Sequence, residues 1–236
     1  MSAENLAEVI ESLKKDVEKL AKTNESLQRQ VDRTTAVTEC LRLMGRYAYL
    51  HATNRHAEMV ELFAKKAPDV RVQLGHAGIW DGTEGIKKVY QGMGGMTFDP
   101  ESSKGVMIIH PNITPYVEVA GDGKTAKGVW LSNGLTTLRN RETGKLDPCW
   151  AWGTYGIDFI KEDGQWKFWH IHVYRLFHAP YHESWAEHDT ASERADAPSN
   201  ADRPPIDDYP YDANKVFVFK PDLPEPYETF DEKTAY

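Results

Sequence analysis

Two long apolar segments joined by a tight turn dominate the middle of the chain, where residues 155–177 read YGIDFIKEDGQWKFWHIHVYRLF. β-Branched and aromatic residues fill both segments, and Glu162-Asp163-Gly164 between them has the composition of a hairpin turn. Similar segments alternate with glycine-containing turns upstream, and the expected strands are 105–110, 113–119, 126–138, 150–159 and 166–176. The sequence therefore predicts a meander of long antiparallel strands.

The region before these strands has mainly the periodicity of helices. Residues 33–52, 56–66 and 83–92 read as helices, and residues 69–75 read as a short strand. Helices followed by long antiparallel strands predict an α+β fold in which a cone-shaped, curved antiparallel sheet wraps around helices. We expect this domain to span residues 33–185.

The first 32 residues carry a heptad repeat. Leucine occupies every d position and β-branched residues occupy all but one of the a positions, where Asn24 stands, a pattern that favours parallel pairing of helices. An amphipathic helix packed on its own domain is the alternative, because the repeat covers only about four heptads. We expect residues 1–32 to form a coiled-coil oligomerisation helix, so that the protein is a homo-oligomer, a dimer or a trimer. The apolar positions are Leu6, Ile10, Leu13, Val17, Leu20, Leu27 and Val31.

The last segment, residues 186–236, is polar and rich in proline, a composition that cannot form a packed domain of its own. It nevertheless carries aromatic residues, among them the run VFVF at 216–219. We expect an extended tail that packs on its own subunit or on a partner subunit.

Charge and composition exclude several partners. The net charge of −8 and the lack of a Lys/Arg cluster argue against a nucleic-acid partner. The sequence has no run of about 18 apolar residues and no apolar signal core, so we expect no membrane partner. Cys40 and Cys149 lie far apart without a CxxC spacing, which indicates a cytoplasmic location.

Four segments resemble the nuclear transport factor 2-like superfamily and its SnoaL-like branch, which includes polyketide cyclases and scytalone dehydratase. They are RYAYLHATNRHAEMVELFA (46–64), GIWDGTEGIKKVY (78–90), IIHPNITPYVEVAGDGKTAKG (108–128) and YGIDFIKEDGQWKFW (155–169), and the resemblance covers about residues 33–178. It implies a cone closed by helices around a hydrophobic pocket. It does not imply one function, since members of the superfamily are dehydratases, isomerases, cyclases, hydrolases and binding modules.

The resemblance also implies catalytic positions. The Tyr-Asp pair that scytalone dehydratase-like enzymes carry on the first long helix falls at His51 and Ala52, so the aspartate is missing and His51 or Tyr49 would supply the polar function. The strand histidine of these enzymes falls at His110, which we expect to protonate a departing hydroxyl as imidazolium. The polar residue of their penultimate strand falls near Tyr155. Their second histidine has no match, because the corresponding region holds residues 130–133.

Alternation along the last strand adds a second group of candidates. His170, His172 and Tyr174 share a face with Trp166 and Phe168, the face that lines the cone in the resembling family, although a bulge would reverse the assignment. We expect His170 to be catalytic; the alternative is a histidine that is hydrogen-bonded in the core. The expected substrate-binding residues are Tyr155, His172, Tyr174, Trp80, Trp130 and Asn133, while His178 and His182 are expected to be structural or interfacial.

We expect neither a metal nor another cofactor. The HIH sequence at 170–172 has the spacing of metal-binding strands, but no carboxylate follows within a few residues, and the nearest acid is Glu183. No glycine-rich phosphate cradle is evident either.

A pocket lined with aromatic and imidazole groups suits a flat aromatic ligand that carries hydroxyl groups. We therefore expect a cofactor-independent carbon–oxygen or carbon–carbon lyase that acts by acid–base catalysis on a small hydrophobic aromatic alcohol. The zipper-like N-terminus and the Pro-aromatic tail resemble those of the cofactorless diarylpropane lyases of bacterial lignin catabolism. This resemblance implies dehydration and deformylation of a lignin-derived diarylpropane diol to a stilbene and formaldehyde. A polyketide cyclase or ring isomerase of the same fold, and a non-catalytic ligand-binding module, are the alternatives.

Overall fold

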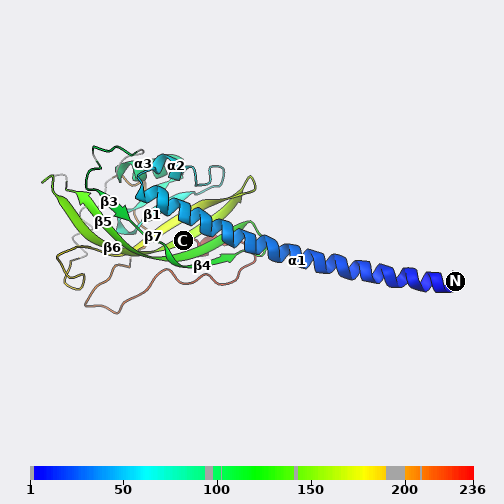
Figure 1. Ribbon diagram of the computed structural model, residues 1–236. Helices are drawn as coiled ribbons and strands as arrows, with labels where there is room; N and C mark the ends of the chain where they lie inside the picture. Colours follow the sequence, from blue (N-terminus) through cyan, green and yellow to red (C-terminus); the bar gives the residue numbers. More distant parts are fainter. Residues whose placement is uncertain (1–2, 94–97, 102, 141–142, 190–199, 208) are drawn as a thin grey trace.

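The computed structural model describes residues 3–93, 98–101, 103–140, 143–189, 200–207 and 209–236. It shows an α+β domain with a long helix at its N-terminus (Figure 1), which confirms the predicted fold class. The helices are α1 (Ala3–Ala52), α2 (His56–Val60) and α3 (Gly82–Gly92). The strands are β1 (Arg71–Leu74), β2 (Ile79–Asp81), β3 (Met107–Ile109), β4 (Ile113–Val119), β5 (Thr125–Arg139), β6 (Leu146–Glu162) and β7 (Gln165–Pro180).

The strands form one sheet in the order β2-β1-β7-β6-β5-β3, and β4 also pairs with β5. All pairs are antiparallel except β1 with β7, which are parallel. Strand β2, which pairs with β1, was not among the strands predicted from the sequence. The helix expected at 56–66 ends at Val60, because the chain beyond it pairs with β7: the N–H of Ala64 donates to the carbonyl of Phe168 at 2.8 Å.

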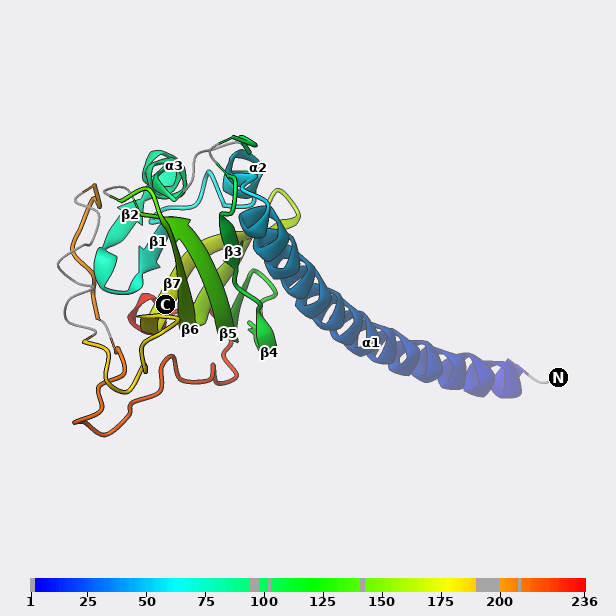
Figure 2. The same ribbon diagram turned by 60° about the vertical axis from the view of Figure 1, so that its left-hand side comes forward.

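Helix α1 is continuous but has two different parts. In its C-terminal part, steps of four and three residues place Ala36, Cys40, Met44 and Tyr47 in the core against the concave face of the sheet. Its N-terminal part extends away from the domain (Figures 1 and 2), and the heptad residues Leu13 and Leu20 are 57% and 67% exposed. No described helix has a stretch that is both long and apolar enough to cross a membrane.

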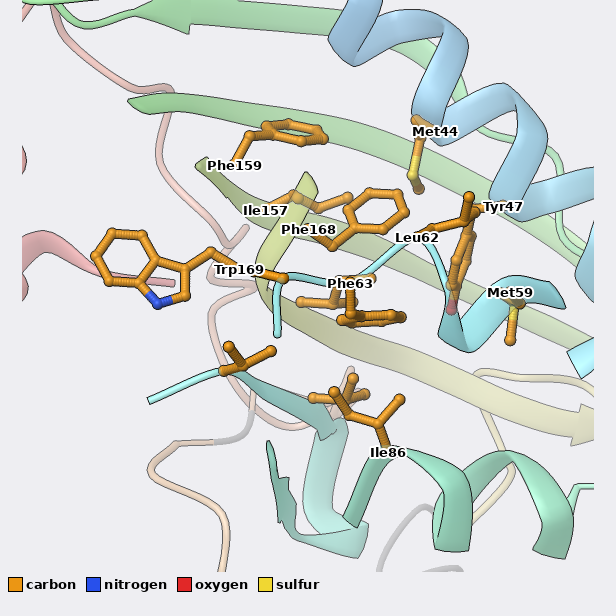
Figure 3. Packing of buried hydrophobic residues seen from close by; sticks show 14 of the residues in the cluster. Met44, Tyr47, Met59, Leu62, Phe63, Ile86, Ile157, Phe159, Phe168 and Trp169 are labelled. Atoms are coloured by element: carbon orange, nitrogen blue, oxygen red, sulfur yellow. The ribbon is translucent and has the colours of Figure 1, made fainter. Parts of the chain in front are cut away.

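The core lies between the concave face of the sheet and the helices. Figure 2 shows α2 and α3 together at one end of the sheet, beside the last turns of α1. Aromatic rings from three elements meet there (Figure 3): Phe168 lies 5.4 Å from Phe63, 5.5 Å from Phe159 and 5.4 Å from Tyr47, centroid to centroid. Complete burial of such a side chain contributes about 1.5–3 kcal/mol, so this cluster holds the helices on the sheet.

A bulge at Trp169 decides which side chains of β7 face the core. Phe168 pairs with Phe159 but His170 pairs with Asp158, so Trp169 is one extra residue in the strand. In Figure 3 the Trp169 indole points away from the Phe168 ring. An extra residue shifts by one position the alternation of side chains between the two faces of the sheet. Beyond Trp169, even-numbered side chains therefore face the convex side, whereas Phe168 faces the concave side. The side chains that the bulge turns to the convex face are His170, His172 and Tyr174.

A second bulge, at Leu176, reverses the faces again. Arg175 pairs with Gly153 while Phe177 pairs with Trp152, so Leu176 is the extra residue. As a result, Arg175 and His178 both face the concave side, although their numbers differ by three.

The tail crosses the convex face of its own sheet. The side-chain amide of Gln73 donates to the carbonyl of Asp207 at 2.9 Å, and the Thr154 hydroxyl donates to the carbonyl of Lys220. The N–H of Gly121 donates to the carbonyl of Tyr227 at 2.9 Å. Residues 190–199 and 208 of the tail lie outside the described residues.

A buried charge cluster lies under this tail. Asp158 on β6 is fully buried, and its carboxylate accepts from Lys127 Nζ at 2.7 Å and from the N–H of Tyr236 at 2.8 Å. His170 Nδ1 lies 2.8 Å from Oδ2 of this carboxylate, the oxygen that also accepts from the N–H of Tyr236. Three partners offset the desolvation of the Asp158 charge, so loss of any one of them would leave a poorly compensated buried charge and destabilise the fold.

Candidate active site

A cavity of about 310 Å³ lies between the concave face of the sheet and the C-terminal end of α1. Small-molecule sites usually have volumes of about 300–1,000 Å³, so the cavity is large enough for a small organic ligand. Its apolar walls come from residues such as Leu74, Ile108 and Val173. The polar side chains that face it include Tyr47, His51, His110, Tyr155, Arg175 and His178.

His51 enters the cavity from the last turn of α1. It lies four residues after Tyr47, so both side chains project from the same face of the helix. The chain then turns sharply, with Asn54 at a φ of 53°, and returns with His56 as the first residue of α2. His51 Nδ1 and His56 Nε2 lie 3.1 Å apart, and both rings are buried. This hydrogen bond fixes the orientation of the His51 ring and leaves its Nε2 for the cavity.

The position of the missing aspartate does not face the cavity. Ala52 is exposed, so a carboxylate there would point toward solvent. Tyr49 is 79% exposed, because it lies about 200° around the helix from Tyr47. The expectation that Tyr49 reaches the site is therefore wrong, and His56 is the polar group that contacts His51.

His110 follows β3 directly and lies over His51. The two rings are stacked, with centroids 5.5 Å apart and planes 10° apart. Gly134 on β5 makes room for the imidazole, since a Cβ at this position would lie 2.4 Å from His110 Nδ1. The sequence thus brings two imidazoles from distant segments into contact, as the resemblance implied for these positions.

The cavity histidines are neutral at neutral pH. Burial, together with the nearby Arg175 charge, lowers the pKa of His110 to about 4. Burial, His110 and His56 lower the pKa of His51 to about 3. Because imidazole must be charged to act as a strong acid, the lowered pKa values favour a role for both rings as bases over the imidazolium role expected of His110.

Tyrosines supply protonated groups beside these bases. Tyr47 and Tyr155 pack edge to face with ring centroids 6.3 Å apart, and the Tyr47 and Tyr90 hydroxyls lie 3.0 Å apart. Burial raises the pKa of both Tyr47 and Tyr155 well above the usual range, so their hydroxyls stay protonated. Tyr155 lines the cavity. This is the location expected from its match to the penultimate-strand position of the resembling enzymes.

Three further polar side chains complete the cavity lining. His178 Nε2 lies 3.0 Å from the Thr136 hydroxyl oxygen. The Ser132 hydroxyl is buried and has no hydrogen-bond partner in the described part of the chain. A ligand hydroxyl would satisfy it.

Several residues expected at the site lie elsewhere. Trp80 is fully buried in the core, and Trp130 packs against Phe159 with centroids 6.0 Å apart; both belong to the core and do not line the cavity. Asn133 is exposed on the convex face, because the even-numbered residues of β5 face the cavity.

The three polar residues of β7 are also outside the cavity. His170 binds Asp158, and His172 stacks on Tyr174 with centroids 3.7 Å apart beneath the tail, with its Nε2 3.4 Å from Asp207 Oδ1. The prediction that His170, His172 and Tyr174 line the cone is wrong, because the bulge at Trp169 reverses the strand.

Other residues line the cavity that were not expected there from the sequence: Tyr47, Arg175 and His178. Tyr47 could have been found from its spacing of four residues before His51 on a helix. Arg175 could not, because the bulge at Trp169 that turns it inward has no sequence signal here. A count by twos from Phe168 does place His178 on the concave face, since the two bulges cancel there. Within the described ranges, no group of three His, Cys, Asp or Glu side chains is arranged to hold a metal ion.

Comparison with protein families identifies the domain. Residues 32–172, more than half of the chain, match the model of the SnoaL-like domain. The chain belongs to the SnoaL-like domain family. This finding confirms the predicted resemblance, and the sheet closed by helices confirms the nuclear transport factor 2-like fold.

Solved structures share this SnoaL-like fold at low sequence identity. A putative scytalone dehydratase from Novosphingobium aromaticivorans is 20% identical with a TM-score of 0.52, over 66% of this chain and 93% of that chain. The hexachlorocyclohexane dehydrochlorinase LinA-type3 from Novosphingobium barchaimii is 14% identical with a TM-score of 0.52, over 66% of this chain and 96% of that chain. No curated protein sequence gives a significant match. At these identities the likeness establishes the fold.

Proposed function

We propose that this SnoaL-like protein is a cofactor-independent lyase for a hydrophobic aromatic alcohol, converting a diarylpropane diol to a stilbene, formaldehyde and water. The observation that supports this most is the pair of stacked, neutral imidazoles of His51 and His110, set beside protonated tyrosines in an apolar cavity. Such a site offers a base and a proton donor at once. The neighbours that share the fold are named as a dehydratase and a dehydrochlorinase, both of which carry out eliminations.

The first step would be loss of the benzylic hydroxyl. A phenolate para to this carbon supplies the electron pair that expels the hydroxyl, and the ring becomes a quinone methide. Tyr155, which burial keeps protonated, donates its proton to the departing oxygen, so that water leaves. The carbon–oxygen bond breaks without any oxidant or reductant.

The second step would release formaldehyde. His51 Nε2, oriented by His56, takes the proton of the terminal hydroxyl. The bond between that carbinol carbon and the adjacent carbon then breaks, formaldehyde leaves, and the electron pair forms the alkene and restores the phenolate. The proton on His51 returns to the Tyr155 oxygen, so the products are one stilbene, one formaldehyde and one water per diol.

The same groups would also suit a ring isomerase or cyclase. A neutral imidazole can remove an acidic C–H proton next to a carbonyl, and the nearby Arg175 charge would stabilise the enolate that forms. This alternative predicts turnover of such a ketone and no formaldehyde from the diol.

The test is incubation of the protein with a 1,2-diarylpropane-1,3-diol that has a free 4-hydroxyl group. We expect stilbene absorbance and formaldehyde to rise in equal amounts. His51→Gln should lower kcat by about 10²–10⁴. His182→Gln, at an exposed position outside the cavity, is the matched control and should keep the rate. Formation of neither product would remove the proposal, and full activity in His51→Gln would refute the assigned base.

A further inference from the structure

The hydroxyl of Ser132 is a polar group that the fold buries without satisfying it. Ser132 lies on β5 and lines the cavity, and only 4% of its surface is exposed. Its hydroxyl is shielded from solvent and has no hydrogen-bond partner among the residues that the structure describes. Because such burial is unfavourable, an unpaired hydroxyl in a cavity wall indicates a group that a ligand completes.

The neighbours of Ser132 on the concave face explain why it has no partner there. Ser132 pairs with Gly153 on β6, and Gly134 lies two residues further along β5. Neither glycine has a side chain that could bond to the hydroxyl. The preceding residue on this face is Trp130, whose indole packs in the core against Phe159. The nearest positions on β5 and β6 thus supply no group for this hydroxyl.

A ligand oxygen at this place would also reach His110. The imidazole packs over Gly134, since a Cβ there would lie 2.4 Å from His110 Nδ1. Alternate residues of a strand are about 7 Å apart, so one oxygen atom fits between the Ser132 hydroxyl and the His110 ring and can bond to both. Burial lowers the pKa of His110 to about 4, so at neutral pH one ring nitrogen accepts a hydrogen bond. The two partners match an alcohol, because the serine hydroxyl donates to its oxygen and its own O–H donates to the imidazole.

We infer that Ser132 and His110 together bind the hydroxyl group on the carbon next to the aromatic ring of the ligand, and that Ser132 makes the cavity select alcohols over their deoxy analogues. The inference rests on the proposed function for its choice of an aromatic alcohol as ligand. This hydroxyl is the group that leaves in the proposed reaction, and Ser132 holds it near Tyr155, which lies diagonally across from Ser132 on β6. A ligand without this hydroxyl leaves the buried serine unpaired and binds less tightly.

The test uses 4-methoxybenzyl alcohol and 4-methylanisole, which differ only in this hydroxyl and lack a free phenol. Calorimetric titration of the unmodified protein should give a dissociation constant about tenfold lower for the alcohol than for 4-methylanisole. In Ser132→Ala this ratio should fall to near one, because the comparison of two ligands in two proteins isolates the contact. An unchanged ratio in Ser132→Ala, equal binding of both probes to the unmodified protein, or absence of saturable binding would overturn the inference.

Thermal unfolding of the ligand-free protein gives a second readout. Ser132→Ala removes an unpaired hydroxyl, so its melting temperature should equal that of the unmodified protein or be up to about 4 °C higher. Thr154→Val is the matched control, because the Thr154 hydroxyl is also buried in the sheet but donates to the carbonyl of Lys220, outside the cavity. This variant should melt about 2–4 °C lower and keep the ratio of the dissociation constants. A fall of the same size in Ser132→Ala would show that its hydroxyl already has a partner in the free protein and would contradict the inference.

Two further outcomes separate this inference from neighbouring ideas. 4-Methoxybenzaldehyde carries a carbonyl oxygen on the same carbon, and tighter binding of this aldehyde than of the alcohol would overturn the alcohol assignment. Turnover of the diol is measured separately: a preference for the alcohol without stilbene would refute the lyase and keep the alcohol site, whereas stilbene formation without the preference would refute the role of Ser132.

Discussion

Gly134→Ala should move His110 and weaken both stability and activity. Gly134 lies on β5 directly beside the imidazole, and an added Cβ would lie 2.4 Å from His110 Nδ1. The same Cβ would lie 2.8 Å from two backbone carbonyl oxygens, those of Ile109 and Ala151. The imidazole can rotate away, but the two carbonyls belong to strands on either side of β5 and move only if the strands separate.

The magnitude follows from two opposing contributions. Overpacking of this kind costs about 1–3 kcal/mol, and replacing glycine by alanine in a strand returns about 0.5–1 kcal/mol of backbone entropy. We therefore expect a net loss of up to about 2.5 kcal/mol in the free energy of unfolding, with a central value of about 1 kcal/mol. Because a displacement of about 1 Å at a reacting group can cost 10²-fold in rate, kcat for the diol should fall by about 10- to 100-fold.

Urea unfolding and initial rates of stilbene formation measure the two effects. Gly45→Ala is the matched control: Gly45 lies within α1 with no atom inside 4 Å of an added Cβ, so the change should stabilise the protein by about 0.5–1 kcal/mol. Unchanged stability and rate in Gly134→Ala would refute the packing of His110 against β5. A loss of stability with normal kcat would show that the position of His110 does not matter for the reaction.

Three other predictions follow from features described above. Lys127→Met leaves the Asp158 carboxylate buried without its cation and should lower the unfolding free energy by about 3–5 kcal/mol in urea titrations, whereas Lys66→Met at an exposed ion pair should change nothing measurable. His51 and His110 have pKa values of about 3 and 4 in the folded protein, against 6.5 in the unfolded chain. The unfolded chain therefore binds more protons below pH 6.5, so the melting temperature should be highest above pH 6.5 and fall toward pH 4. Equal melting temperatures at about pH 7 and about pH 4.5 would contradict this. Leu13→Asp combined with Leu20→Asp should convert the oligomer to monomers in light scattering, and a monomeric unmodified protein would contradict the coiled-coil interpretation.

The order of the elements could be predicted because each depends on local sequence. The periodicity of Ala36, Cys40 and Met44 along a helix, and the aromatic runs of the strands, survive in the folded domain. The cavity positions of His51 and His110 came from the resemblance to a family, since their segments are far apart in the chain.

The face of the sheet toward which each side chain of β7 points could not be predicted in full. Alternation places Phe168 correctly on the concave face, but a count by twos beyond it fails at the bulge of Trp169. Buried polar residues such as His170 and His172 indicate either a cavity or a covering segment, and here both lie beneath the tail, His170 beside Phe230 and His172 beside Asp207. Arg175, the cation of the cavity, is placed on the concave face only when the bulge at Trp169 is counted.

The position of the tail has a consequence for the order in which the protein matures during translation. The buried side chains of the core cluster come from residues up to Ile171, and the tail adds only partly buried ones, Ala201 and Phe230, so the core can assemble while the tail is still being made. Asp158 and Lys127 then face water until Thr234 and Tyr236 emerge and supply their last partners. The nascent domain would pass through a stage in which the concave side, with its cavity, is built while the convex side is still hydrated.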